Sequence, residues 1–237
     1  MNDVVDFRKG TDADDRLGPQ RVTHAKIFSE KQVWIAAAIS FALAVVCGIP
    51  LVLQGGLPIL AIGLLSIFFG YAYTGGPFPL AYWGLGDLFV VIFFGLVPTL
   101  GLGYLQTGEW MKEAIILGLQ IGLHCAILIA INNLRDVESD RRSGRKTIPV
   151  VFGIQAAKVE IFLLIWMPYL LGTFWLPALS HWGALLPLIS LPLATILMIN
   201  IFATHPGSSY NKYLGQGALL HLSFGILTAA GFFVCRL

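Results

Sequence analysis

Long apolar runs dominate this sequence, and each is about 20 residues long, enough to cross the ~30 Å hydrocarbon core of a bilayer as a helix. The chain is 57% hydrophobic and 12% charged, about half the charged fraction of a soluble domain. Cys47, Cys125 and Cys235 sit singly inside these runs, without metal or redox spacing, and are expected to be buried apolar side chains. We therefore predict an all-α integral membrane protein, a multi-span helical bundle with seven spans at 33–53, 57–73, 86–106, 113–133, 157–179, 182–203 and 215–235.

The loops between these runs alternate between the two sides of the membrane. One side receives the N-terminal segment 1–32 and the loops 74–85, 134–156 and 204–214. Of the 15 Lys and Arg residues, only Lys112 and Arg236 fall on the other side. Positive residues favour the cytoplasm, so we predict that this side is cytoplasmic. The net charge of +2 gives no reason to expect nucleic-acid binding.

Two acidic stretches lie on the predicted cytoplasmic side. The first stretch is "NDVVDFRKGTDADDRLGPQR" at 2–21, and the second stretch is "NNLRDVESDRRSGRKT" at 132–147. In each, an Asn precedes an Asp by four residues and a further Asp follows: Asn2, Asp6 and Asp12 in the first, and Asn132, Asp136 and Asp140 in the second. Residues 132, 136 and 140 would share one stripe of a helix, at a hydrated helix end.

The charges of these stretches suggest a type of ligand. Clustered carboxylates repel one another unless cations lie between them. Mg²⁺ is usually held by one or two carboxylates together with substrate phosphates, and neighbouring Arg and Lys can hold phosphate oxygens. The pattern therefore predicts a site for a lipid diphosphate. Two alternatives are solvated flanks of the spans and a transporter or lipid-binding protein, but a transporter would place its acids near the bilayer midplane.

At these stretches the sequence resembles the UbiA superfamily of intramembrane prenyltransferases. The run "RKGTD" followed by "RLGP", and "YTGGPFPLAYWGLGDLFVVIFFGLVPTLGLGYLQTG" at 73–108, are similar to the branch that acts on 1,4-dihydroxy-2-naphthoate in menaquinone and phylloquinone synthesis. The resemblance covers the whole chain. It implies transfer of a polyprenyl group to that acceptor, with release of diphosphate and CO₂. Other acceptors within the superfamily are 4-hydroxybenzoate, homogentisate, chlorophyllide and haem.

The resemblance also implies Mg²⁺ as cofactor and assigns residues to the site. The metal ligands would be Asp6, Asp12, Asp136 and Asp140, and Lys9 would be a further catalytic residue. Substrate-binding residues would be Asn2, Asp12, Arg16, Arg21, Tyr73, Tyr82, Asn132, Asn133, Arg135, Arg141, Arg145 and Lys146. Trp83 and Tyr104 are further aromatic candidates for stabilising an allylic cation, and Asp87 is a candidate because it lies near a span end on the same side.

The expected setting is a bacterial cytoplasmic membrane, with a prenyl diphosphate, an aromatic acceptor and the lipid bilayer as partners. The family has nine helices, and its first motif lies at the cytoplasmic end of the second. This chain opens on that motif, so we expect one transmembrane domain over 1–237 that lacks the first helix and most of the second.

Overall fold

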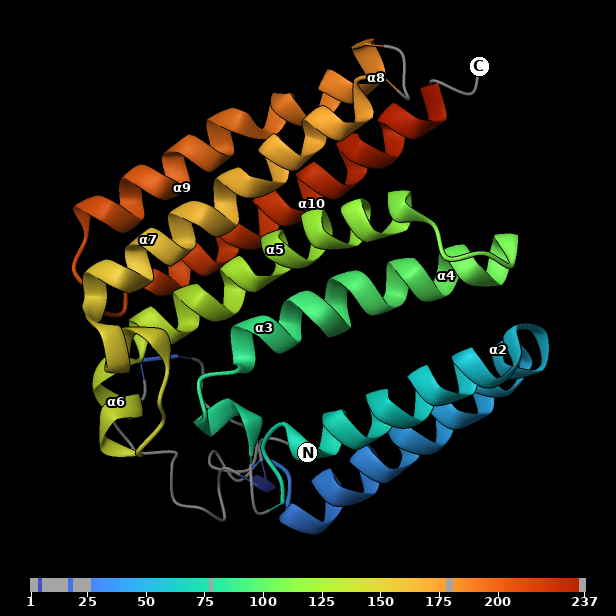
Figure 1. Cartoon of the computed structure of the whole chain (residues 1–237). Coiled ribbons are helices and arrows are strands. Elements are labelled where there is room, and N and C mark those ends of the chain that lie inside the picture. Colours follow the sequence, from blue (N-terminus) through green and yellow to red (C-terminus); the bar gives the residue numbers. More distant parts are fainter. Residues whose placement is uncertain (1–3, 6–16, 19–26, 77–78, 178–180, 235–237) are drawn as a thin grey trace.

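The computed structural model describes residues 4–5, 17–18, 27–76, 79–177 and 181–234 (Figure 1). Within this part of the chain, the regular elements are all helical. They are α2 (Glu30–Ala72), η1 (Leu80–Tyr82), α3 (Gly86–Val91), η2 (Ile92–Leu96), α4 (Val97–Thr107), α5 (Lys112–Arg135), α6 (Val137–Arg142), α7 (Ile148–Leu171), η3 (Gly172–Trp175), α8 (His181–Leu185), η4 (Leu186–Ser190), α9 (Leu191–Ala203) and α10 (Tyr210–Val234). Among the described residues, six helices are long and apolar enough to cross a membrane, which confirms an all-α integral membrane protein.

The first two predicted spans are the two limbs of α2. This element has 43 residues and leaves helical geometry at Gly56 (φ 66, ψ −150), a conformation that glycine adopts without steric cost. The chain reverses there, so the limbs form a hairpin at the edge of the bundle beside α4 (Figure 1). Ile59 is the buried residue of this hairpin, and Cys47 is exposed on it. The expectation of a buried Cys47 was therefore wrong, because the hairpin packs along one side only.

Helix α5 lies at the centre of the bundle, packed against α7, α10 and the α3–η2–α4 span. Its side chains Ile127, Ile131 and Leu134 are fully buried in the main apolar core. Against η2, the two backbones approach so closely that a Cβ added to Gly95 would lie 2.3 Å from the carbonyl oxygen of Gly118. This close packing fixes where α5 ends relative to the start of α3.

Some helices extend beyond the apolar runs that predicted them. Helix α5 continues to Arg135, α7 starts at Ile148 and bends at Gly153 (φ 86), and α10 starts at Tyr210. The predicted loop 134–156 therefore contains α6 and the start of α7 from Ile148 to residue 156, where Pro149 suits a helix start. Hydropathy finds only the apolar part of a helix, so polar helix ends were missed.

Candidate active site at the charged end of the bundle

A cavity of about 360 Å³ lies where α5 ends and α3 begins; we call this end of the bundle the charged end. Its polar lining includes Asp87, Asn132, Asn133, Arg135, Asp136, Asp140, Arg145 and Thr147. Its apolar lining includes Val90, Phe94, Leu128 and Ile129, which lie further along the same helices toward the bundle interior. The cavity therefore combines charged groups at a helix end with an apolar wall.

The three predicted residues of the second stretch occur one turn apart, as expected, but not on one helix. Helix α5 ends at Arg135, and Asp136 has a non-helical conformation (φ −96, ψ 15) before α6 begins. The backbone amide of Asp136 still donates to the Asn132 carbonyl (2.9 Å), and that of Asp140 donates to the Asp136 carbonyl (2.8 Å). Because these bonds continue the helical spacing across the break, all three residues line the cavity.

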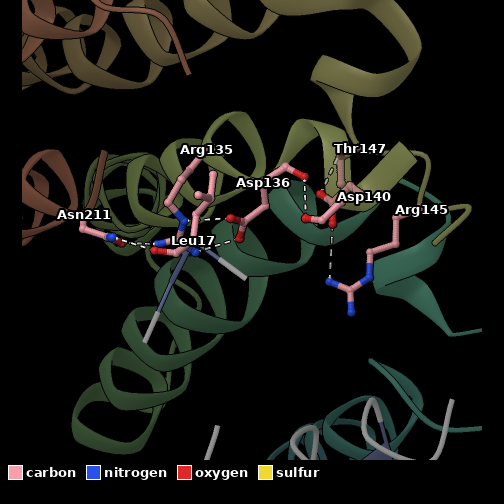
Figure 2. A network of polar contacts seen from close by, with 8 residues as sticks. Leu17, Arg135, Asp136, Asp140, Arg145, Thr147 and Asn211 are labelled. Atoms are coloured by element: carbon pink, nitrogen blue, oxygen red, sulfur yellow. Dashed lines mark hydrogen bonds and ion pairs between the residues drawn. The ribbon is translucent and has the colours of Figure 1, made fainter. Parts of the chain in front are cut away.

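Asp136 forms a bidentate ion pair with its neighbour Arg135 (Figure 2). Arg135 Nε and Nη2 donate to the two carboxylate oxygens at 2.8 and 2.7 Å. Arg135 is only 3% exposed, and the Asp136 side chain is 21% exposed. The Asp136 carboxylate at this helix end is therefore partly exposed, and a buried guanidinium balances its charge.

Asp140, on α6, is buried, and its carboxylate has two side-chain partners. Arg145 Nη1 lies 3.7 Å from one carboxylate oxygen, and the Thr147 hydroxyl donates to the other at 3.4 Å. Burial raises the pKa of the Asp140 carboxyl to about 6, and the nearby Arg145 guanidinium opposes that shift. A cation bound in the cavity would favour the ionised form of this carboxyl.

The predicted aromatic residues are not all at the cavity. Tyr73, just after α2, lines it, and the Arg145 guanidinium lies 5.0 Å from the centre of the Tyr82 ring. Tyr104 is near the C-terminal end of α4, at the opposite end of the span, where it stacks on Trp110 with ring centroids 4.5 Å apart. The structure therefore brings Tyr73 and Tyr82 to the site but not Tyr104.

Two of the predicted basic residues lie outside the cavity lining. The Lys146 ammonium lies 4.4 Å from the centre of the Trp83 ring. Arg141 donates to the Glu138 carboxylate at 3.0 and 3.1 Å on the exposed surface of α6. Of the basic residues predicted in the second stretch, Arg135 and Arg145 therefore line the cavity.

Most of the first stretch lies outside the described residues. This applies to Asn2, Asp6, Lys9, Asp12, Arg16 and Arg21. Leu17 and Gly18 of the same stretch are described; Leu17 contacts α10, and Gly18 lies against the end of α5. The Leu17 carbonyl accepts from Asn211 Nδ2 at 2.8 Å, and a Cβ on Gly18 would lie 2.7 Å from Arg135 Nη2. This part of the first stretch is therefore at the charged end, beside the second stretch.

Among the cavity-lining residues to which sequence reasoning gave no role are Thr147 and Cys125. Thr147 immediately precedes α7, but its hydroxyl makes no capping bond there and contacts Asp140 instead. Cys125 is half-buried on the cavity wall. Cys125 and Ile129 share one face of α5 with Asn132, so helical periodicity could have found the thiol.

The oxygen donors of the cavity fit a hard divalent cation. The carboxylates of Asp87, Asp136 and Asp140 line the cavity with the side-chain amide of Asn132. Among the described residues, no group of three or more His, Cys, Asp and Glu side chains is arranged to hold a metal by itself. Mg²⁺ suits such a set, because it typically takes one or two carboxylates and completes its shell with water and phosphate oxygens.

Together, the fold and the cavity define a multi-span helical membrane protein with mixed acidic and basic groups beside an apolar wall. The sequence profile of the UbiA prenyltransferase family matches residues 1–233, and the chain belongs to this family. This match confirms the resemblance found in the two acidic stretches.

Similar proteins come from several bacteria. The chain is 28% identical over 240 residues to 1,4-dihydroxy-2-naphthoate octaprenyltransferase of Haemophilus influenzae, which covers 98% of this chain and 78% of the relative. The chain is 35% identical over 200 residues to the 1,4-dihydroxy-2-naphthoate octaprenyltransferase of Escherichia coli, a match that covers 81% of this chain and 65% of the relative. It is 38% identical over 156 residues to the Mycobacterium tuberculosis protein of the same name, a match that covers 64% of this chain and 52% of the relative. The matches thus span about half to three quarters of the relatives' own lengths.

Proposed function

We propose that this protein transfers a polyprenyl group from a prenyl diphosphate to 1,4-dihydroxy-2-naphthoate, with release of diphosphate and CO₂. The observation that carries this proposal is the cavity, which places Asp136, Asp140 and Arg145 beside an apolar wall. A prenyl diphosphate has the same two chemical parts, a charged head and an apolar chain. The relatives named for this reaction support the choice of acceptor.

The carboxylates of the two stretches would hold Mg²⁺ at the diphosphate. We assign this role to Asp136 and Asp140, together with Asp6 and Asp12, and propose that Asn2 and Asn132 orient ligands or waters. When bound, Mg²⁺ neutralises the developing charge on the diphosphate leaving group. Arg145, beside Asp140, supplies further positive charge to the phosphate oxygens.

The reaction breaks the bond between the first prenyl carbon and the diphosphate oxygen, and the bonding electrons leave with the diphosphate. The π electrons of the naphthoate ring then form the new carbon–carbon bond. CO₂ departs and leaves its bonding pair in the ring, which restores aromaticity. Lys9 and Arg16 are the basic residues to which we assign the acceptor carboxylate.

The cavity wall would protect the allylic cation that forms in this reaction. Tyr73 lines the cavity, and aromatic faces attract cations. Phe94, Leu128 and Ile129 exclude water, which would otherwise capture the cation as an alcohol. The apolar chain of the substrate would lie along these same side chains.

The charged end would face the cytoplasm of a bacterial cell, within the cytoplasmic membrane. This orientation follows from the distribution of Lys and Arg, since only Lys112 and Arg236 fall on the opposite side of the predicted spans. Both water-soluble partners of the reaction, the diphosphate head and the naphthoate, would then enter from the same compartment.

The test is a membrane assay with prenyl diphosphates of several lengths, each paired with 1,4-dihydroxy-2-naphthoate, 4-hydroxybenzoate or homogentisate. Products are identified by mass, which reports the prenyl length and the loss of CO₂ together. We expect a decarboxylated prenyl naphthalenediol. A product from another acceptor alone would contradict the proposed acceptor, and the absence of prenyl transfer with any pair would contradict the proposed reaction.

A further inference from the structure

Asn211, in the first turn of α10, contacts two segments that are far apart in the sequence (Figure 2). Its side-chain oxygen accepts a hydrogen bond from Arg135 Nη1 at 2.7 Å. Its side-chain nitrogen donates to the Leu17 carbonyl at 2.8 Å. The side-chain amide of Asn211 therefore connects the end of α5 to residue 17 of the first stretch. Its oxygen binds Arg135, and its nitrogen binds Leu17.

The contact with Arg135 bears on the geometry of Asp136. Two edges of the Arg135 guanidinium are used: Nε and Nη2 hold the Asp136 carboxylate, and Nη1 is held by Asn211. Because the guanidinium is planar and rigid, fixing Nη1 also fixes the direction in which Arg135 presents its other donors to Asp136. Loss of the Asn211 oxygen would leave a buried charged donor without that partner, and the orientation of Asp136 would be less well defined.

The contact with Leu17 lies next to a second contact, between Gly18 and the guanidinium of this ion pair. Gly18 is buried, and any Cβ at this position would lie 2.7 Å from Arg135 Nη2. A side chain at residue 18 would therefore require the Arg135 guanidinium to shift from its present position. The Leu17–Asn211 bond holds the backbone beside the guanidinium.

We propose that Asn211 is a positioning residue that aligns the two acidic stretches with each other, acting through Arg135 on Asp136 and through Leu17 on the first stretch. This inference rests on the proposed function, since Asp136 is there assigned to the metal-bound diphosphate. Asn211 itself does not line the cavity, so its effect is on the arrangement of other residues.

The first readout is kinetic. Asn211→Ala removes both contacts and should raise the KM for prenyl diphosphate about tenfold, the order of effect of losing a hydrogen bond to a charged group. The KM for the acceptor should be unchanged. Asn211→Asp keeps the acceptor for Arg135 but cannot donate to Leu17, so it should raise the KM for prenyl diphosphate clearly less than the alanine variant does.

The second readout does not depend on activity. Trypsin can cleave after Arg16 and after Arg21, on either side of the docked residues. Cleavage at these sites in the detergent-solubilised protein, followed by peptide mass, should be faster in both Asn211 variants than in the wild type, because both lose the Leu17 contact. Asn200→Ala is the matched control: Asn200 bonds Gln216 at 3.1 Å between α9 and α10, so its loss should change neither readout.

Unchanged KM and unchanged cleavage in a folded Asn211→Ala protein would overturn the proposal, and so would equal KM increases for both substrates. Equal increases in the alanine and aspartate variants would also overturn it, because the aspartate retains the contact to Arg135. If Asn211→Ala does not fold, the Asn211→Asp variant still tests the Leu17 contact by its cleavage rate. A wild-type protein without prenyl transfer would contradict the proposed function, while the cleavage comparison would still test the role of Asn211.

Discussion

Gly84 lies directly against the carbonyl of Lys146, so close that a Cβ on Gly84 would be 2.3 Å from that oxygen. Gly84 also has a positive φ of 72°, and the Lys146 amide donates to the Tyr82 carbonyl at 3.0 Å nearby. These contacts hold the loop before α3 against the segment that carries Arg145 and Thr147. The position of Asp87, three residues after Gly84, therefore depends on a glycine.

Gly84→Ala should displace this loop and reduce prenyl transfer by at least about tenfold, because both the left-handed conformation and the contact with Lys146 exclude a side chain. Gly108→Ala is the control, since Gly108 has a similar φ of 77° but a Cβ at that position would meet nothing within 4 Å. Activity and melting temperature of both variants give the comparison. Similar losses in the two would show that backbone strain, rather than the contact with Lys146, sets the effect.

Thr147→Val should reduce activity several-fold with little change in stability. The substitution keeps the shape of the side chain but removes the hydroxyl that donates to Asp140, and it does not remove a helix cap because the hydroxyl makes none. Thr147→Ser retains the hydroxyl and should restore most of the activity. Steady-state kinetics of the three proteins check this; a serine variant as impaired as valine would contradict the role of the hydroxyl.

Removal of divalent metal should abolish prenyl transfer without unfolding the protein. In the chain itself, Arg135 and Arg145 already lie beside Asp136 and Asp140, so these two carboxylates do not require a metal for charge balance. We expect EDTA to remove activity, Mg²⁺ to restore it, and the melting temperature in detergent to change by no more than a few degrees. Activity that persists in EDTA would contradict the assignment of the acids as metal ligands.

Cys125 offers a direct probe of where the prenyl chain lies, because it is on the cavity wall. In a protein with Cys47→Ser and Cys235→Ser, a prenyl diphosphate with Mg²⁺ should slow the labelling of Cys125 by N-ethylmaleimide about tenfold or more. Inorganic pyrophosphate with Mg²⁺ should protect much less, since it has no apolar chain. Equal labelling rates with and without prenyl diphosphate would place the chain elsewhere.

The spans were predictable because crossing a bilayer requires long apolar helices, and a run at 86–106 became the span Gly86–Thr107. The acidic stretches were predictable because their dense acidic and basic residues stand out in a chain that is only 12% charged. The pairing of Arg135 with Asp136 could not be predicted from the sequence. Adjacent side chains on a regular helix point in different directions, and this contact occurs where the helix breaks after Arg135. The role of Asn211 could not be predicted from the sequence either, because its two partners come together only in the folded bundle.

The most direct test of the central claim compares three variants on one short helix and its boundary: Asp136→Asn, Asp140→Asn and Glu138→Gln. Each removes one carboxylate charge, but Asp136 and Asp140 line the cavity, whereas Glu138 is exposed and pairs with Arg141. Asp136→Asn should also lower stability by about 2 kcal/mol, because it leaves the buried Arg135 without its full counter-charge, so activity is measured per folded protein. We predict that prenyl transfer to 1,4-dihydroxy-2-naphthoate falls at least about a hundredfold in both aspartate variants and stays within about twofold of wild type in Glu138→Gln. Wild-type activity in folded Asp136→Asn and Asp140→Asn would contradict the claim that this cavity is the active site.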